Sequence, residues 1–259
     1  MEKCCLILIS NESFAHAEED IQVLTGIKVP HSTQHRLGLK HQIGLKKIES
    51  EVEELSVDGG SVRIRTPRGE KSEWRQYKAI KIHELGAGAL FKEDELLSNW
   101  VNQQNLGEQV TCLGDGHDGV WNVVAEIGTL SQRREILDWY HLMENVYKVG
   151  LKKEKLKKVK NYLWEGLWCE AIGELWSERN EQSQKLINYL QKHQSRIVNY
   201  KWCQQQGVSI GSGQVESLIK QIATRIKIIG SQWKQTNVSQ MLKLRCGYLN
   251  GDFSSSIYA

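Results

Sequence analysis

The chain has 259 residues, 40% of them hydrophobic, which suffices for one catalytic domain with an elaboration or for two small domains. Its 34 basic and 31 acidic residues leave a net charge of +3, so overall charge does not by itself indicate a nucleic-acid partner. Only two prolines occur, which argues against a turn-rich all-β sandwich and is compatible with a mixed α/β protein.

The cysteines and apolar runs indicate a cytoplasmic protein. None of the six cysteines forms a C-x-x-C pair or has a histidine at zinc-finger spacing, so we expect reduced thiols. The apolar run Cys4–Ile9 is too short for a secretory or membrane-spanning segment. We therefore expect a cytoplasmic, nucleoid-associated protein without a membrane partner.

Residues 1–50 are predicted to be a helical segment interrupted at Gly26–Pro30. Two short helices across a glycine-containing turn resemble a helix-turn-helix, with Ser32 or Thr33 as the cap of the second helix. The side chains that would then face a major groove are Gln34, His35 and Arg36. An ordinary helical hairpin explains the same pattern equally well.

Residues 51–150 are predicted to form the first part of a catalytic core. The hydrophobic period changes to two in Leu55–Ile64, which predicts a strand, a turn at Gly59–Gly60 and a second strand. A third strand at Trp74–His83 would complete an antiparallel meander, and the helix after it carries Leu96–Val101.

The next run, Gln109–Gly114, predicts a buried strand that delivers Asp115 at its carboxyl end. A short helix through Trp121 and a strand at Arg134–Asp138 follow, and a further helix begins near His141. Meander, helix, strand, helix and strand is the element order of a ribonuclease H-like sheet.

The remainder is predicted to be helical. Residues 151–206 form an all-α insertion, and residues 207–259 form carboxyl-terminal helices that complete the core, with Glu216 near a helix start after Gly211–Gly213. The predicted fold class is thus α/β: a ribonuclease H-like mixed sheet flanked by helices, with an all-α insertion before the last catalytic helix.

Three carboxylates on separate elements, Asp58, Asp115 and Glu216, provide the hard oxygen ligands that magnesium or manganese requires. Glycines beside the two aspartates would let a phosphate backbone approach closely. The pattern predicts a two-metal site for phosphodiester chemistry. Taken singly, each carboxylate has an ordinary explanation as a turn or surface residue, and Asp118 and Asp138 are rivals for the second position.

Four motifs follow one another along the chain: Val57–Gly60, Cys112–Trp121, Leu137–Asn145 and Ile210–Ser217. In this order they resemble a family of bacterial insertion-sequence transposases related to the Mutator class. The resemblance implies that Asp58, Asp115 and Glu216 are the metal-binding acidic triad. It also implies that Asp138 and His141 match the Cys/Asp-x-x-His motif near the active site. On spacing alone, His141 is equally well explained as a structural histidine at a strand-to-helix junction.

By this resemblance the chain would cleave double-stranded DNA at transposon ends with two Mg²⁺ or Mn²⁺ ions, then join the freed 3′-hydroxyl to target DNA. A homodimer on DNA is expected. Relatives generally carry an additional amino-terminal region, so a truncated chain is also expected. Two alternatives stay open: a noncatalytic DNA-binding remnant, and a ribonuclease H-like structure-specific nuclease that only hydrolyses DNA.

Two further surfaces are candidates for DNA contact. Six lysines crowd Lys152–Lys160, and helical spacing places Lys153, Lys157 and Lys160 on one face, which a merely solvated helix would also explain. A second basic group consists of Lys220, Arg225, Lys227 and Lys234. In the insertion, Trp164 and Trp168 are predicted to share a helix face, where core packing is favoured over stacking on an unpaired base.

Overall fold

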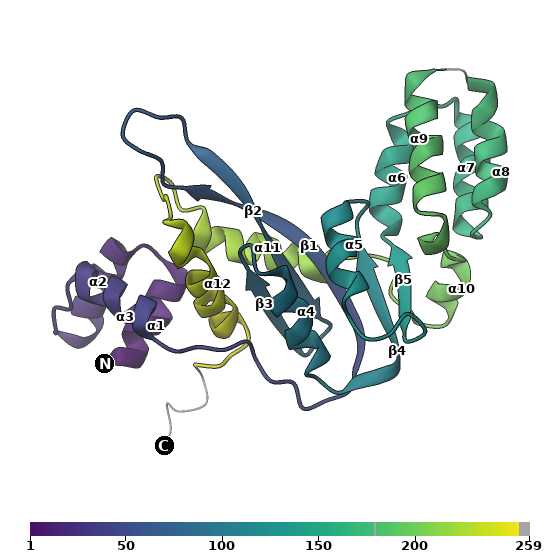
Figure 1. Ribbon diagram of the computed structural model, residues 1–259. Helices are drawn as coiled ribbons and strands as arrows, with labels where there is room; N and C mark the ends of the chain where they lie inside the picture. The colour runs from purple at the N-terminus through teal and green to yellow at the C-terminus, as the bar shows by residue number, and fades with distance from the viewer. Residues whose placement is uncertain (179, 254–259) are drawn as a thin grey trace. The chain divides into compact units, whose positions relative to one another are not determined.

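A computed structural model describes residues 1–178 and 180–253. Its centre is one five-stranded sheet of order β3-β2-β1-β4-β5, flanked by helices (Figure 1). The strands are β1 (Val52–Ile64), β2 (Glu73–Ile82), β3 (Gly86–Leu90), β4 (Leu106–Gly114) and β5 (Arg133–Leu137). Strand β4 pairs in parallel with β1 and β5, whereas β2 and β3 are antiparallel. The mixed sheet confirms the predicted α/β class.

The chain divides into two compact units. The first comprises Met1–Glu51, Asp58–Asn105 and Gln214–Ala259, and the second comprises Val52–Val57 and Leu106–Gly213. Strand β1 and the helix that begins at Gly213 each contribute residues to both units.

The first unit packs helices around the β1–β3 meander. Its helices are α1 (Glu2–Asn11), α2 (Phe14–Thr25), α3 (His31–Lys40), α4 (Asp94–Asn102), α11 (Gly213–Ile226) and α12 (Gln235–Leu249). Helix α12 packs against β3, α1 and α3. Ile9, Ile222 and Met241 are fully buried in this core. Burial of each such side chain contributes roughly 1.5–3 kcal/mol.

The predicted helix pair is present as α2 and α3, but the cap of the second helix differs from the prediction. Gly26 ends α2 with φ +72°, a conformation that glycine adopts readily. Helix α3 begins at His31 after Pro30 and has no capping bond from its own N-cap side chain. Instead, the Glu18 carboxylate accepts from the His31 N–H at 2.8 Å. Glu18, 13 residues earlier in the chain, thus caps the start of α3 in place of Ser32 or Thr33.

The three expected groove-facing residues of α3 differ in exposure. Gln34 is fully buried, and its amide donates to the Val29 carbonyl at 2.9 Å, so it cannot reach a groove. His35 is half-buried against Phe14, with ring centroids 4.9 Å apart. Only Arg36 of the three is exposed. The prediction that all three residues face a major groove is therefore wrong.

Strand β1 corrects the predicted hairpin. The backbone runs extended through Gly59–Gly60, and a Cβ on Gly60 would lie 2.2 Å from the ring of Tyr77 on β2. The chain reverses later, where the Glu70 N–H donates to the Pro67 carbonyl and Gly69 has φ +94°. Glycine permits close packing as well as turns. The Gly59–Gly60 pair was therefore predicted to be the turn, although the chain reverses only at residues 67–70.

Strand β3 was not predicted. Its sequence, Gly86–Leu90, is rich in glycine and alanine and lacks the β-branched residues that mark strands. All five residues are buried, and the strand forms through its antiparallel register with Lys78–Ile82.

The second unit carries β4, β5 and most of the predicted helical stretch. Its helices are α5 (Asp118–Ala125), α6 (Trp139–Tyr147), α7 (Lys153–Trp164), α8 (Trp168–Leu175), α9 (Glu181–Lys192) and α10 (Tyr200–Gln205). Helices α7, α8 and α9 pack as neighbours (Figure 1). Trp164 and Trp168 lie on different helices, separated by Gly166 with φ +79°, so they share no helix face. Trp164 instead packs against Trp139, with ring centroids 4.8 Å apart, which agrees with a role in core packing.

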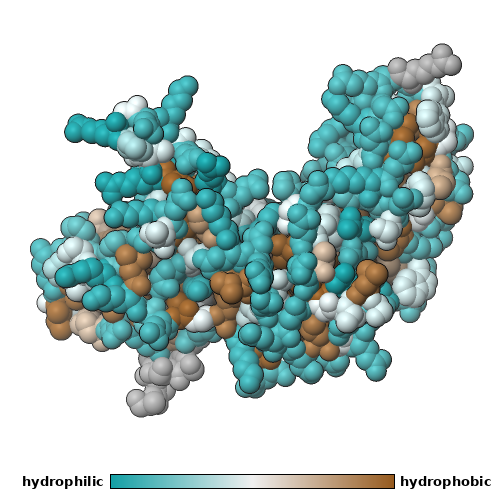
Figure 2. Space-filling model, in the orientation of Figure 1, coloured by the Kyte–Doolittle hydropathy of each residue, from teal (hydrophilic) through white to brown (hydrophobic). Residues whose placement is uncertain are grey.

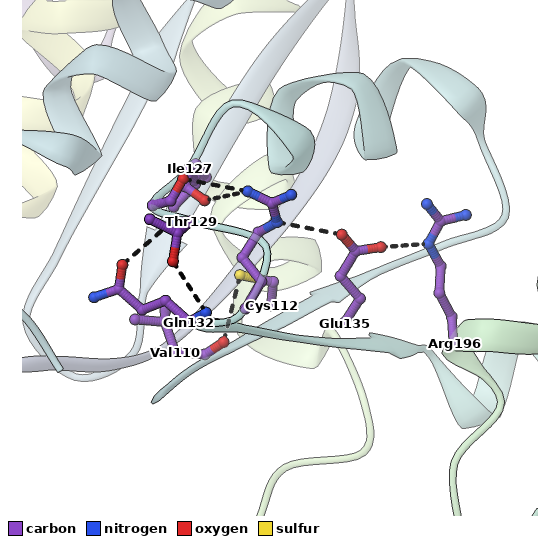
Figure 3. Close-up of polar contacts among 9 residues, drawn as sticks. Val110, Cys112, Ile127, Thr129, Gln132, Glu135 and Arg196 are labelled. Atoms are coloured by element: carbon purple, nitrogen blue, oxygen red, sulfur yellow. Dashed lines mark hydrogen bonds and ion pairs between the residues drawn. The ribbon is translucent and has the colours of Figure 1, made fainter. Parts of the chain in front are cut away.

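A charged network ties the helical stretch to β5 (Figure 3). Glu135 accepts from Arg133 Nε at 3.3 Å and from Arg196 Nε at 2.7 Å. The Arg196 guanidinium also lies 4.2 Å from the Trp121 ring centroid. These contacts join α5, β5 and the turn after α9 close to the strand end that leads into Asp138.

The face shown in Figure 2 is largely hydrophilic, with scattered hydrophobic residues. No helix within the described residues is long and apolar enough to cross a membrane. All six cysteines are free thiols.

Candidate metal centre

Asp138 lies between the end of β5 and the start of α6, and its side chain is fully buried. One carboxylate oxygen, Oδ1, accepts from the His141 N–H at 2.9 Å, which caps α6. The other, Oδ2, accepts from the Ser212 hydroxyl at 2.7 Å and from the Ser212 N–H. These donors compensate for the hydration that a buried carboxylate loses. Asp138 therefore links the start of α6 to the segment that precedes α11.

His141 lies in the first turn of α6 and is half-buried. Its Nδ1 is 3.5 Å from Oε2 of Glu144, one helical turn further along the same face. A carboxylate beside one ring nitrogen orients an imidazole for ligation through the other nitrogen. The structure therefore gives His141 a partner suited to a ligand role.

Glu216 lies in the first turn of α11, the helix that begins directly after Ser212. Because the helix is continuous, Ser212 fixes the start of the turn that carries Glu216. The ligand atoms of Asp138, His141 and Glu216 lie within 4.8 Å of one another. This Asp/His/Glu group could hold a metal ion.

Asp115 directly follows β4, as the sequence predicted, and is half-buried. Its Oδ1 accepts from the His117 N–H at 2.8 Å. The flanking glycines have a packing role: a Cβ on Gly114 would lie 2.5 Å from Val120, and one on Gly116 would lie 2.3 Å from the Tyr189 ring. That space holds side chains, which corrects the interpretation that it admits a phosphate backbone.

Asp118 is the weaker rival for the second carboxylate position. Its side chain is 68% exposed and forms an ion pair with Lys192. The hydrogen bond from Lys192 is the largest of the effects that lower the pKa of Asp118. A carboxylate neutralised by a lysine and open to water is poorly placed to bind a metal ion.

Asp58 lies in the middle of β1 and not after a strand. It is half-buried, and its Oδ1 accepts from the N–H of the adjacent Gly59 at 2.6 Å. Its charge adds to the burial that raises the pKa of Tyr77 on β2. Asp58 and Asp115 are not members of the Asp/His/Glu group among the described residues, so their metal-binding roles stay predictions.

Two residues at this centre, Ser212 and Glu144, were missed from the sequence. Ser212 gives no local signal, because its partner Asp138 is 74 residues away. Glu144 follows His141 by three residues, a spacing that places both on one helix face and could have indicated their contact.

Two carboxylates and one imidazole are ligands that divalent metal ions accept in proteins. The Asp/His/Glu group could therefore hold a metal ion.

Comparison with protein-family models found no match to the chain, and comparison with curated proteins found no similar sequence.

Proposed function

We propose that this chain is a DDE-type transposase, with a ribonuclease H-like core that cleaves DNA at transposon ends and transfers the strand to target DNA. The observation that carries the proposal is the convergence of Asp138, His141 and Glu216 into a group that could hold a metal ion. The element order also supports it, since meander, helix, strand, helix and strand occur along β1 to β5.

In this proposal His141 and Glu216 would hold a divalent ion, and Asp138 would contribute an oxygen. Asp138 also positions the other two residues, because it accepts from the His141 N–H and from Ser212, which directly precedes α11. Asp58 and Asp115 provide further carboxylates for a two-ion Mg²⁺ or Mn²⁺ site. A divalent ion supplies stabilisation of the charge that develops on a phosphate during phosphodiester cleavage.

The proposed substrate is double-stranded DNA, bound by a homodimer. Exposed lysines on α7 support a DNA partner: Lys153, Lys157 and Lys160 recur at helical spacing, and all three are exposed. Such a face can neutralise backbone phosphates.

The test is a cleavage and strand-transfer assay with labelled duplex DNA that carries the element's end, in Mn²⁺ or Mg²⁺. Variants Asp58→Asn, Asp115→Asn and Glu216→Gln should each lose about three orders of magnitude in rate, because removal of a ligand weakens charge stabilisation in the transition state. Calorimetric titration with Mn²⁺ should show in parallel that Glu216→Gln weakens ion binding.

The matched control is Asp118→Asn, which removes an exposed carboxylate three residues from Asp115 and should keep nearly full activity. A wild-type protein that binds DNA but shows no metal-dependent cleavage would mark the chain as a noncatalytic DNA-binding protein. Hydrolysis without strand transfer from a pre-cleaved end would instead identify a structure-specific nuclease.

A further inference from the structure

The first unit contains a cavity of about 440 Å³ that is separate from the proposed metal ligands. Phe14 and His35 line it from α2 and α3, and Arg65 lines it from the residue after β1. Its wall is completed by Ser13 before α2, by Arg225 on α11, and by residues between Ile228 and Asn237, which end in the first turn of α12. Four segments distant in sequence therefore build one cavity.

The cavity is lined by positive charge. Arg65, Arg225 and Lys234 all contribute to its wall, and no carboxylate occurs among the described lining residues. Burial and the charges of Lys234 and Arg225 lower the pKa of His35 in the same wall. An anionic ligand would be attracted to this environment.

Arg225 is the unusual member of the wall. The sequence placed it on an exposed basic surface, but it is only 2% exposed, so that prediction is wrong. Its guanidinium lies 5.0 Å from the ring centroids of both Phe14 and Trp233. Burial lowers its pKa to about 10, so it stays charged at neutral pH.

The Arg225 guanidinium is only partly hydrogen-bonded within the part of the chain that the structure describes. Nε donates to the Ile9 carbonyl at 2.5 Å, whereas Nη2 is buried without a hydrogen-bond partner among the described residues. Glu12 interacts with this charge electrostatically but does not line the cavity. A buried donor without an acceptor is unfavourable, and a bound oxyanion would relieve it.

The wall around Arg225 is held rigidly. The Trp233 N–H donates to the Arg63 carbonyl at 3.0 Å, and the Arg65 N–H donates to the Trp233 carbonyl at 2.9 Å. The indole Nε1 of Trp233 donates to the Ile226 carbonyl at 2.9 Å. A preorganised wall lowers the entropic cost of binding a ligand.

We propose that this cavity binds a phosphate ester, supplied either by a DNA strand or by a mononucleotide. Arg65 and Lys234 would pair with the phosphate oxygens at the mouth, and Arg225 would provide the buried positive charge behind them. Ile229, which is fully exposed beside the mouth, would contact the attached sugar or base. The inference rests on the cavity alone and does not depend on the metal centre.

The test is calorimetric titration of the full chain, without divalent ions, with inorganic phosphate, a 5′-mononucleotide and a single-stranded 12-mer. The double variant Arg65→Gln/Lys234→Gln should weaken binding at least tenfold for every probe that the wild type binds. The matched control is Lys227→Gln, which removes one exposed charge two residues from Arg225 and outside the cavity, and should change affinity less than threefold. Thermal melting checks that all variants fold.

The three probes separate the sources of the phosphate. If all three bind through Arg65 and Lys234, the cavity recognises the phosphate itself, and if only the 12-mer does, the ligand is a DNA strand. Binding of the mononucleotide alone indicates a free nucleotide. The proposal is overturned if no probe binds, or if the control weakens binding as much as the double variant does.

Discussion

At the scale of single residues, Asp138 and Asp115 have different surroundings although both were predicted from the sequence. Asp138 is fully buried and accepts hydrogen bonds from His141 and Ser212. Asp115 is half-buried, and its carboxylate accepts from the nearby His117 N–H. Asp138 therefore holds two segments together in addition to being a candidate ligand, whereas Asp115 closes a local turn.

This difference predicts different stabilities for the two alanine variants. Asp138→Ala should lower the free energy of unfolding by about 3 kcal/mol, since it removes a helix cap and leaves buried donors without an acceptor. Asp115→Ala should lower it by less than about 1 kcal/mol, as expected for a change outside the core. Urea unfolding followed by circular dichroism measures both, and equal decreases would contradict the structural role of Asp138.

At the scale of elements, strand β1 depends on how closely β2 packs against it. Gly60 accommodates the ring of Tyr77, a side chain that is 1% exposed. The adjacent Gly59 has ordinary space, since a Cβ there would lie 3.5 Å from Lys78 Nζ and from the Tyr77 carbonyl. The two glycines of one dipeptide therefore carry different constraints.

Substitution of each glycine by alanine separates these constraints. Gly60→Ala should destabilise the protein by about 1–3 kcal/mol, because Tyr77 must move out of a packed position. Gly59→Ala should be neutral or stabilising by about 0.5 kcal/mol, because alanine loses less conformational freedom in a strand. Thermal melting provides the comparison, and a larger destabilisation by Gly59→Ala would show that β1 turns there after all.

At the scale of the whole molecule, binding to DNA depends on charges that the protein does not already neutralise. On α7, two lysines form ion pairs: Lys155 Nζ lies 2.6 Å from Glu178 Oε1, and Lys158 Nζ lies 3.6 Å from Glu174 Oε1. Lys153, Lys157 and Lys160 are exposed on the same helix, and no ion pair to them occurs within the described residues. Lys153, Lys157 and Lys160 are therefore better candidates for binding phosphates than Lys155 and Lys158.

The triple variant Lys153→Gln/Lys157→Gln/Lys160→Gln should weaken binding to duplex DNA. The slope of log K against the logarithm of the salt concentration should also become less steep, by about 0.9 for each phosphate that a lysine no longer neutralises and by about 2.7 if all three are lost. The control Lys155→Gln/Lys158→Gln should change the slope much less, because these lysines are paired with glutamates. Fluorescence anisotropy across a salt series measures both slopes. Identical slopes for wild type and triple variant would exclude α7 from the DNA interface.

The sequence by itself determined the type of most elements and their order. Alternating and helical periodicities predicted β2, β4 and β5 and nearly every helix, because hydrophobic period is a property of each segment alone. The resemblance of the motifs implied Asp58, Asp115 and Glu216 as metal ligands, with Asp138 and His141 close by. Of these five residues, the structure groups Asp138, His141 and Glu216. The α/β class followed from these elements.

Only the tertiary structure decided how distant segments meet. It runs β1 through Gly59–Gly60, buries Gln34 and Arg225, and joins Asp138 to Ser212. Gly60 packs against Tyr77, Arg225 donates to the Ile9 carbonyl, and Asp138 accepts from Ser212. These partners are distant in the chain, so no local spacing encodes the contacts. Packing and burial, which hold such partners together, arise only when the whole chain has folded.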